Sequence, residues 1–154
     1  AGVCPLCPTL CVMDSVLAVV VSTAFVVLSL WHFYMAFAGS SSERAAVPSL
    51  DGKPLFIPTT KSTVAVGVVL MLFAGLVAAT SGVLSLGLPR PLLSWLSYAL
   101  ALGLLARAVG EFKYVGFFKE VRGSRFARMD TLLYSQLCLL LSAGVATVAV
   151  QHAA

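Results

Sequence analysis

The sequence predicts an all-α protein, a four-helix transmembrane bundle with short hairpin loops and a basic, aromatic segment at the membrane interface. Of its 154 residues, 60% are hydrophobic and only 10% are charged, and the mean hydropathy is +1.00. Soluble domains carry about 25% charged residues, so this chain lacks the charge to cover a water-exposed surface. Its apolar runs are continuous and do not alternate with polar residues, which excludes a transmembrane β-barrel. The composition also excludes a disordered chain, a coiled coil and, in practice, a nucleic-acid-binding protein.

Four uncharged runs set the expected helices, because crossing a bilayer takes about 20 apolar residues. Asp, Glu, Lys and Arg are absent from residues 15–42, 62–89, 91–106 and 131–154. The third run is the shortest and ends at Arg107, whose side chain must extend toward the interface. We therefore expect helices near residues 13–38, 62–87, 91–110 and 130–152. Together these form a membrane domain of residues 13–154 behind a Cys-rich tail of residues 1–12.

Residue types at the boundaries support these helices. Thr59 and Thr60 follow a proline and are N-cap candidates for the second helix. Residues 87–91, Gly-Leu-Pro-Arg-Pro, predict a short turn between antiparallel helices. In the first loop, Asp51-Gly52 predicts a tight turn.

The basic residues predict the orientation of the chain. Nine of the ten Lys and Arg residues lie on one side, in the loops of residues 39–61 and 111–129 and at Arg107, and only Arg90 lies on the other. Basic loops stay on the cytoplasmic side of a membrane, or on the matrix or stromal side in an organelle. We therefore expect both loops on that side and both termini on the opposite side.

Small residues at four-residue spacing are frequent in the second and third helices. The pairs are Ala74 and Ala78, Gly75 and Ala79, Ala99 and Gly103, and Ala106 and Gly110. Such pairs let helix backbones approach closely in a membrane. They serve either packing within the bundle or docking onto a neighbouring membrane protein, and spacing alone does not separate the two.

Four cysteines are the first candidates for chemistry. Cys4 and Cys7 form a C-x-x-C motif, Cys11 follows, and Cys138 lies inside the fourth helix. A C-x-x-C motif is typical of a redox pair, half a zinc site or a disulfide. No second motif completes a zinc site, so no metal site is expected. The alternatives are an incidental or disulfide-bonded tail for the first three and apolar packing for Cys138.

Two histidines are the second candidates. His32 lies inside the first helix among aromatic residues, whereas His152 ends the fourth helix on the opposite side. A bis-histidine haem needs two imidazoles at one depth, which this chain alone does not supply. Chlorophyll needs one axial ligand, and His32 is suitable for it. The alternative is a neutral His32 hydrogen-bonded to a neighbouring helix.

The segment after the third helix combines aromatic and basic residues. Lys113, Lys119, Arg122, Arg125 and Arg128 are expected to meet lipid headgroups while the interleaved aromatic rings lie at headgroup depth. A polar cluster is expected at this membrane depth, made of His32, Arg107, Glu111 and Asp130. The alternative is that these charges only attach the loop to the bundle.

This stretch resembles a known family. Residues 107–141, RAVGEFKYVGFFKEVRGSRFARMDTLLYSQLCLLL, resemble the signature region of domain of unknown function 3995, and LWHFYMAFAG (30–39) and AVPSLDGKPLFIPTT (46–60) resemble its first span and loop. The N-terminal cysteines are not part of the pattern, and Gln136 stands in place of an expected proline. The resemblance implies a small four-helix membrane protein and no activity. If the signature region carries a function in this family, the resemblance implies that its residues are Glu111, Arg122, Arg125 and Asp130.

Taken together, these features favour a non-catalytic accessory subunit of an energy-converting membrane complex, photosynthetic or respiratory. No nucleophile with its base, P-loop, Rossmann fingerprint or H-E-x-x-H motif is present. The expected partners are membrane lipids and other membrane subunits, and the expected ligands are chlorophyll or bound lipid. We expect an organelle inner or thylakoid membrane or a bacterial inner membrane, and the start at Ala1 suggests a removed targeting segment. The alternatives are a membrane thiol-redox protein and a lipid-handling or transport protein.

Overall fold

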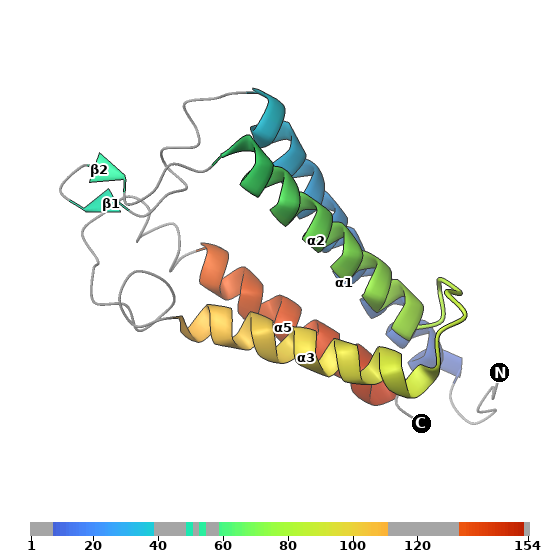
Figure 1. Ribbon diagram of the computed structural model, residues 1–154. Helices are drawn as coiled ribbons and strands as arrows, with labels where there is room; N and C mark the ends of the chain where they lie inside the picture. Colours follow the sequence, from blue (N-terminus) through green and yellow to red (C-terminus); the bar gives the residue numbers. More distant parts are fainter. Residues whose placement is uncertain (1–7, 39–48, 51–52, 55–58, 111–132, 153–154) are drawn as a thin grey trace.

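The computed structural model describes residues 8–38, 49–50, 53–54, 59–110 and 133–152, without the side chains of residues 8–14 and 49–54. Four helices dominate this part of the chain (Figure 1): α1 (Pro8–Ala38), α2 (Thr60–Thr80), α3 (Arg90–Val109) and α5 (Ser135–Gln151). Two short antiparallel strands, β1 (Ser49–Leu50) and β2 (Lys53–Pro54), pair on either side of residues 51–52, where a tight turn was expected. The predicted all-α, four-helix architecture is confirmed.

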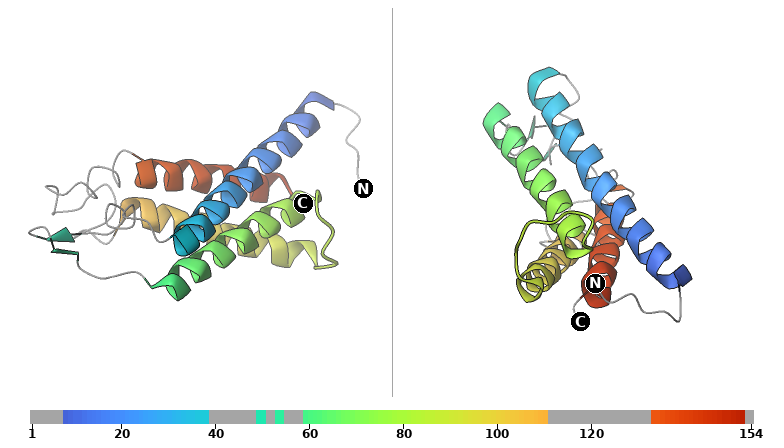
Figure 2. Two further views of the ribbon diagram at one scale, coloured as in Figure 1. Left: turned by 90° about the horizontal axis from the view of Figure 1, so that it is seen from above. Right: turned by 90° about the vertical axis from the view of Figure 1, so that its right-hand side faces the viewer.

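The helices form two pairs. α1 packs along α2, and α3 packs along α5, while contacts between the two pairs are fewer. Figures 1 and 2 show that the pairs come together near the chain termini and the α2–α3 loop, and diverge toward the opposite end. The end of α1 and the end of α3 therefore lie at the diverging end, on different helix pairs.

The core lies where the two pairs meet. Phe25 on α1 is fully buried and packs edge-to-face against Phe73 on α2, with 5.9 Å between ring centroids. Val77 on α2 and Val145 and Val148 on α5 complete the most buried part of the cluster. Edge-to-face ring pairs and close apolar contacts stabilise helix association even where lipid competes for the same surfaces.

The start of α2 follows the expected capping pattern. Thr59 is the N-cap: its hydroxyl oxygen accepts a hydrogen bond from the Ser62 backbone N–H at 3.2 Å. The Ser62 hydroxyl oxygen in turn accepts the Thr59 backbone N–H at 3.1 Å. This reciprocal pair satisfies backbone donors that a helix start leaves without partners.

The expected end of the second helix is wrong by seven residues, since α2 ends at Thr80 and not at residue 87. The Ser81 N–H still bonds to the Val77 carbonyl, but Gly82 then turns into the left-handed region, with φ of 78°. Glycine adopts that conformation without the steric cost that a side chain adds, so it ends the helix. Residues 81–89 are uncharged, which is why hydropathy alone carried the span too far.

The other helices lie close to their expected bounds. α1 begins at Pro8, earlier than residue 13, and α3 spans residues 90–109 against the expected 91–110. α5 is preceded by a π-helical turn at Leu133 and Tyr134, while residues 130–132 lie outside the described residues. The predicted fourth span is therefore described from residue 133 onward.

Three of the described helices are long and apolar enough to cross a membrane, which indicates a membrane location. They are Ser15–Ala38, Thr60–Thr80 and Arg90–Val109. α5 is also apolar but has 17 residues, at the lower end of the length that spans a bilayer.

Candidate functional site

His32 bonds to its own helix and not to a neighbouring one. Its Nδ1 lies 2.7 Å from the carbonyl oxygen of Leu28, one turn earlier on α1, and the side chain is half-buried. Among the described residues His32 makes no hydrogen bond to a neighbouring helix, and the alternative expectation stays a prediction. A carbonyl oxygen only accepts, so Nδ1 carries the proton and donates it.

The polar cluster expected around His32 is described only in part. Arg107 is half-buried in the last turn of α3, whereas Glu111 and Asp130 lie outside the described residues. His32 and Arg107 both lie toward the diverging end of the molecule, on helices from different pairs (Figure 1). The four-residue cluster stays a prediction.

Two other predicted sets lie wholly or mostly outside the described residues. The lipid-headgroup residues Lys113, Lys119, Arg122, Arg125 and Arg128 all fall within residues 111–132. Cys4 and Cys7 also lie outside, and the side chain of Cys11, near the start of α1, is not described. Cys138 is half-buried on α5. These assignments remain predictions.

Hydroxyl groups between helices are the polar contacts that the sequence patterns missed. Ser29 on α1 donates to the Gly67 carbonyl of α2 at 2.7 Å, and Ser142 on α5 donates to the Ala101 carbonyl of α3 at the same distance. The Thr80 hydroxyl on α2 shares a hydrogen bond with the Ser97 hydroxyl on α3 at 2.8 Å. Each such bond stabilises helix association by about 0.6 kcal/mol on average. The sequence feature that could have indicated these contacts is the presence of serine and threonine inside apolar spans.

Close helix contacts form at glycines outside the predicted pairs. A Cβ on Gly67 would lie 2.7 Å from Phe33 Cε1, and one on Gly144 would lie 2.7 Å from Val21 Cγ2. By contrast, a Cβ on Gly75 or Gly103 would meet no atom within 4 Å. Of the predicted pairs, Ala74 and Ala79 are buried, whereas Ala99 and Gly103 are exposed. Packing within the chain therefore does not account for the Ala99–Gly103 pair.

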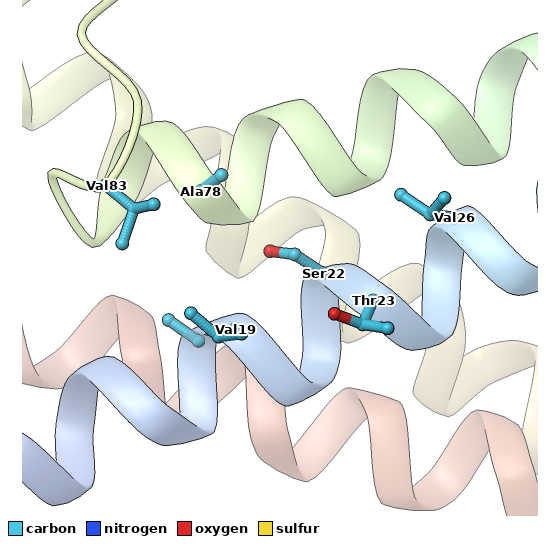
Figure 3. A pocket seen from close by; sticks show the side chains of 7 residues that line it. Val19, Ser22, Thr23, Val26, Ala78 and Val83 are labelled. Carbon is cyan, nitrogen blue, oxygen red and sulfur yellow. The ribbon is translucent and has the colours of Figure 1, made fainter.

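A small apolar cavity lies between α1, the end of α2 and the loop that follows. Its volume is about 240 Å³, and it is lined by Ala18, Val19, Ser22, Thr23, Val26, Ala78 and Val83. Figure 3 shows the Ser22 hydroxyl directed toward the space bordered by Val19, Ala78 and Val83. A dry apolar cavity of about 150 Å³ already holds benzene, so this one accommodates a ring or a short stretch of acyl chain.

The Ser22 hydroxyl in this cavity wall is buried and has no hydrogen-bond partner among the described residues. Serine on a helix commonly donates to the carbonyl one turn earlier, and Ser22 does not. A buried hydroxyl without a partner costs about 1–3 kcal/mol. Ser22 is therefore a polar group that contributes nothing to the helix contacts described above.

Aromatic side chains mark both ends of the apolar helices. Trp31 and Tyr34 lie near the end of α1, are 54% and 61% exposed, and have ring centroids 5.8 Å apart. Trp95, 73% exposed, lies near the start of α3, at the opposite end of the bundle, and packs against Tyr98 at 6.3 Å. Tryptophan and tyrosine gather at both membrane–water interfaces, so these rings agree with a membrane-spanning placement.

A comparison with protein families agrees with this architecture. The sequence profile described as protein of unknown function (DUF3995) matches residues 25–145, which is most of the chain. The chain belongs to the DUF3995 family. No curated protein and no solved structure matches it.

The DUF3995 match includes some of the candidate site residues and excludes others. It runs from Phe25 in α1 to Val145 in α5, so it includes His32 and Arg107. It also includes the expected lipid-headgroup residues, and it excludes Cys4, Cys7, Cys11 and His152. Most of the α1 wall of the cavity precedes the match, since Ala18, Val19, Ser22 and Thr23 lie before it and Val26 lies within it. The cysteine motif and most of that wall therefore lie outside the matched DUF3995 segment, and His32 lies within it.

Proposed function

We propose that this chain is a non-catalytic accessory subunit of an energy-converting membrane complex, photosynthetic or respiratory. In that complex it fills a helix interface and holds a lipid or pigment. The observation that carries the proposal is the outward face of α3, where Ala99 and Gly103 are exposed and Gly103 has open space at its Cβ position. Small outward residues let a helix of another protein approach closely in a membrane.

The rest of this α3 face is apolar. Leu92, Trp95, Leu96 and Leu102 are exposed, and their spacing places them on the same side of the helix as Gly103. The residues that α3 buries, among them Ser97 and Ala101, lie on the other side. A helix with one face used within the chain and a second face that combines small and large apolar residues suits a contact with a neighbouring subunit.

The polar side chains of the described spans support a structural role. Ser29, Thr80, Ser97 and Ser142 join helices of this chain to one another. Among the described residues, no group of three or more His, Cys, Asp or Glu side chains is placed to hold a metal ion.

The cavity around Ser22 supports the lipid-holding part of the proposal. Its walls are apolar apart from Ser22 and Thr23, and its volume of about 240 Å³ suits part of an acyl chain. The same cavity favours a second candidate function, a lipid-handling protein. The two candidate functions differ in what contacts the outward face of α3, since a lipid-handling protein needs no partner subunit there.

Photo-crosslinking tests the proposal directly. A photoreactive phenylalanine analogue at position 103 faces outward, while the same residue at position 101, where Ala101 is buried in the core, serves as the matched control. In native membranes, position 103 is expected to crosslink to a subunit of a respiratory or photosynthetic complex, and position 101 is not. Crosslinks from position 103 to lipid alone contradict the proposal and favour the lipid-handling protein.

A further inference from the structure

The two ring nitrogens of His32 have different roles. Nδ1 lies 2.7 Å from the Leu28 carbonyl oxygen, so Nδ1 holds the proton of that hydrogen bond. In the neutral imidazole of this tautomer Nε2 carries no proton and presents its lone pair, and no hydrogen bond to Nε2 occurs among the described residues. His32 therefore offers one oriented nitrogen lone pair.

The neighbours of His32 on α1 are apolar and aromatic. His32 lies six residues before the end of α1 at Ala38, about 9 Å along the helix axis at a rise of about 1.5 Å per residue. Leu28 and Met35 lie one turn away on the same side of the helix, and both are half-buried. Trp31 is adjacent and exposed, with its ring against Tyr34. On α1, therefore, hydrocarbon and aromatic side chains flank His32.

We propose that His32 Nε2 is the single axial ligand of a metal tetrapyrrole of the magnesium type. A histidine that ligates a metal usually donates its other ring N–H to a carbonyl or carboxylate, which fixes the ring and raises the basicity of the ligating nitrogen. Leu28 supplies that carbonyl. The apolar side chains beside His32 suit a flat macrocycle better than they suit a hydrated headgroup. This inference rests on the pigment-holding part of the proposed function and names its ligating atom.

The second histidine limits the type of tetrapyrrole. His152 makes the same kind of bond, with Nδ1 3.0 Å from the Val148 carbonyl, but it caps α5 at the end where the chain termini lie (Figure 1). His32 lies toward the opposite end, and the chain has no other histidine. Two imidazoles of one chain do not reach the same metal, so a metal that takes one protein nitrogen fits and a bis-histidine haem does not.

The test uses the purified full chain in detergent, titrated with chlorophyll a and with zinc protoporphyrin IX, both of which take one axial ligand. Metal-free protoporphyrin IX serves as the probe for partition into detergent. The wild-type chain is expected to shift the Soret band of both metal probes and to saturate at one per chain. His32→Leu weakens binding by at least about tenfold, and His152→Leu, the matched control, leaves it unchanged.

Rescue by added imidazole distinguishes a His32 that ligates a metal from a His32 that only packs against its neighbours. Imidazole added to His32→Gly is expected to restore the shifted Soret band, which a purely structural role for His32 does not predict. Equal binding by the wild-type chain and His32→Leu overturns the inference, and so does the absence of a shift with both metal probes. Because the test uses the purified chain, the absence of tetrapyrrole binding does not contradict the proposal that the chain is a subunit of a complex. Binding by a chain that proves to be a lone monomer in its native membrane keeps this inference and removes the subunit role.

Discussion

Ser29 on α1 donates its hydroxyl to the carbonyl oxygen of Gly67 on α2 at 2.7 Å, and both residues are buried. Phe33, one turn after Ser29, lies against the same glycine. A hydrogen bond and a close steric contact therefore coincide at one point of the α1–α2 interface. The α2–α3 and α3–α5 interfaces each have a comparable hydroxyl bond, through Thr80 and Ser142.

Removing the Ser29 hydroxyl is expected to weaken the bundle. Ser29→Ala should lower the free energy of unfolding by about 0.6–1.7 kcal/mol, from the average to the largest value measured for hydrogen bonds between membrane helices. Ser22→Ala is the matched control on the same helix, because the Ser22 hydroxyl is buried without a partner among the described residues. That variant should be neutral or stabilising. Unfolding in mixed detergent micelles measures both, and an equal loss in the two variants would refute the assignment.

Adding a methyl group to Gly67 is expected to separate α1 from α2. The new Cβ would lie 2.7 Å from Phe33 Cε1, so the Phe33 ring must shift. Overpacking of this kind costs about 1–3 kcal/mol. Gly103→Ala, also on a helix but with nothing within 4 Å, should show no loss. The same unfolding assay compares them, and destabilisation by Gly103→Ala alone would show that the outward face of α3 is the packed one.

The Thr80–Ser97 contact is expected to couple α2 to α3. The two hydroxyl oxygens lie 2.8 Å apart, and both residues are buried. A double-mutant cycle with Thr80→Val and Ser97→Ala should give a coupling free energy of about 0.6–1.7 kcal/mol. Thr80 also donates within its own helix to the Leu76 carbonyl at 2.9 Å, which the cycle subtracts. If the change in unfolding free energy of the double variant equals the sum of the changes in the two single variants, the two hydroxyls do not interact.

Filling the cavity around Ser22 is expected to release a bound acyl chain. Ala78 lines the cavity and is half-buried, so Ala78→Leu places its larger side chain in that space. The lipid that copurifies with the chain, measured by native mass spectrometry, should decrease. Ala99→Leu adds the same side chain on an exposed face of α3 and should leave the lipid content unchanged. Equal lipid retention in both variants would remove the cavity as the lipid site.

The presence of the helices followed from the sequence because uncharged runs of about 20 residues have few alternatives in a bilayer. Thr59 was also predictable as an N-cap, since its side chain acts over three residues of local sequence. The end of α2 was not predicted, because hydropathy treats Gly82 and its neighbours as apolar while the left-handed backbone of Gly82 ends the helix.

The helix contacts were less predictable than the helices. Four-residue spacing identifies Ala99 and Gly103 as readily as a buried pair, but only the packing of α3 against α5 shows that they face outward. Gly67 and Gly144 form the close contacts because Phe33 and Val21 lie opposite them, and spacing carries no information about the opposite helix. The sequence identifies His32 as an ionisable residue within a span, but its bond to Leu28 depends on side-chain geometry.

The accessory-subunit role is tested most directly by the mass and absorption spectrum of the tagged chain after gentle extraction from its native membrane. Native mass spectrometry and size-exclusion chromatography with light scattering give the mass. We expect a particle far heavier than the 16.1 kDa chain, containing subunits of a photosynthetic or respiratory complex and a tetrapyrrole or lipid. A homogeneous 16.1 kDa monomer without any other subunit would contradict it.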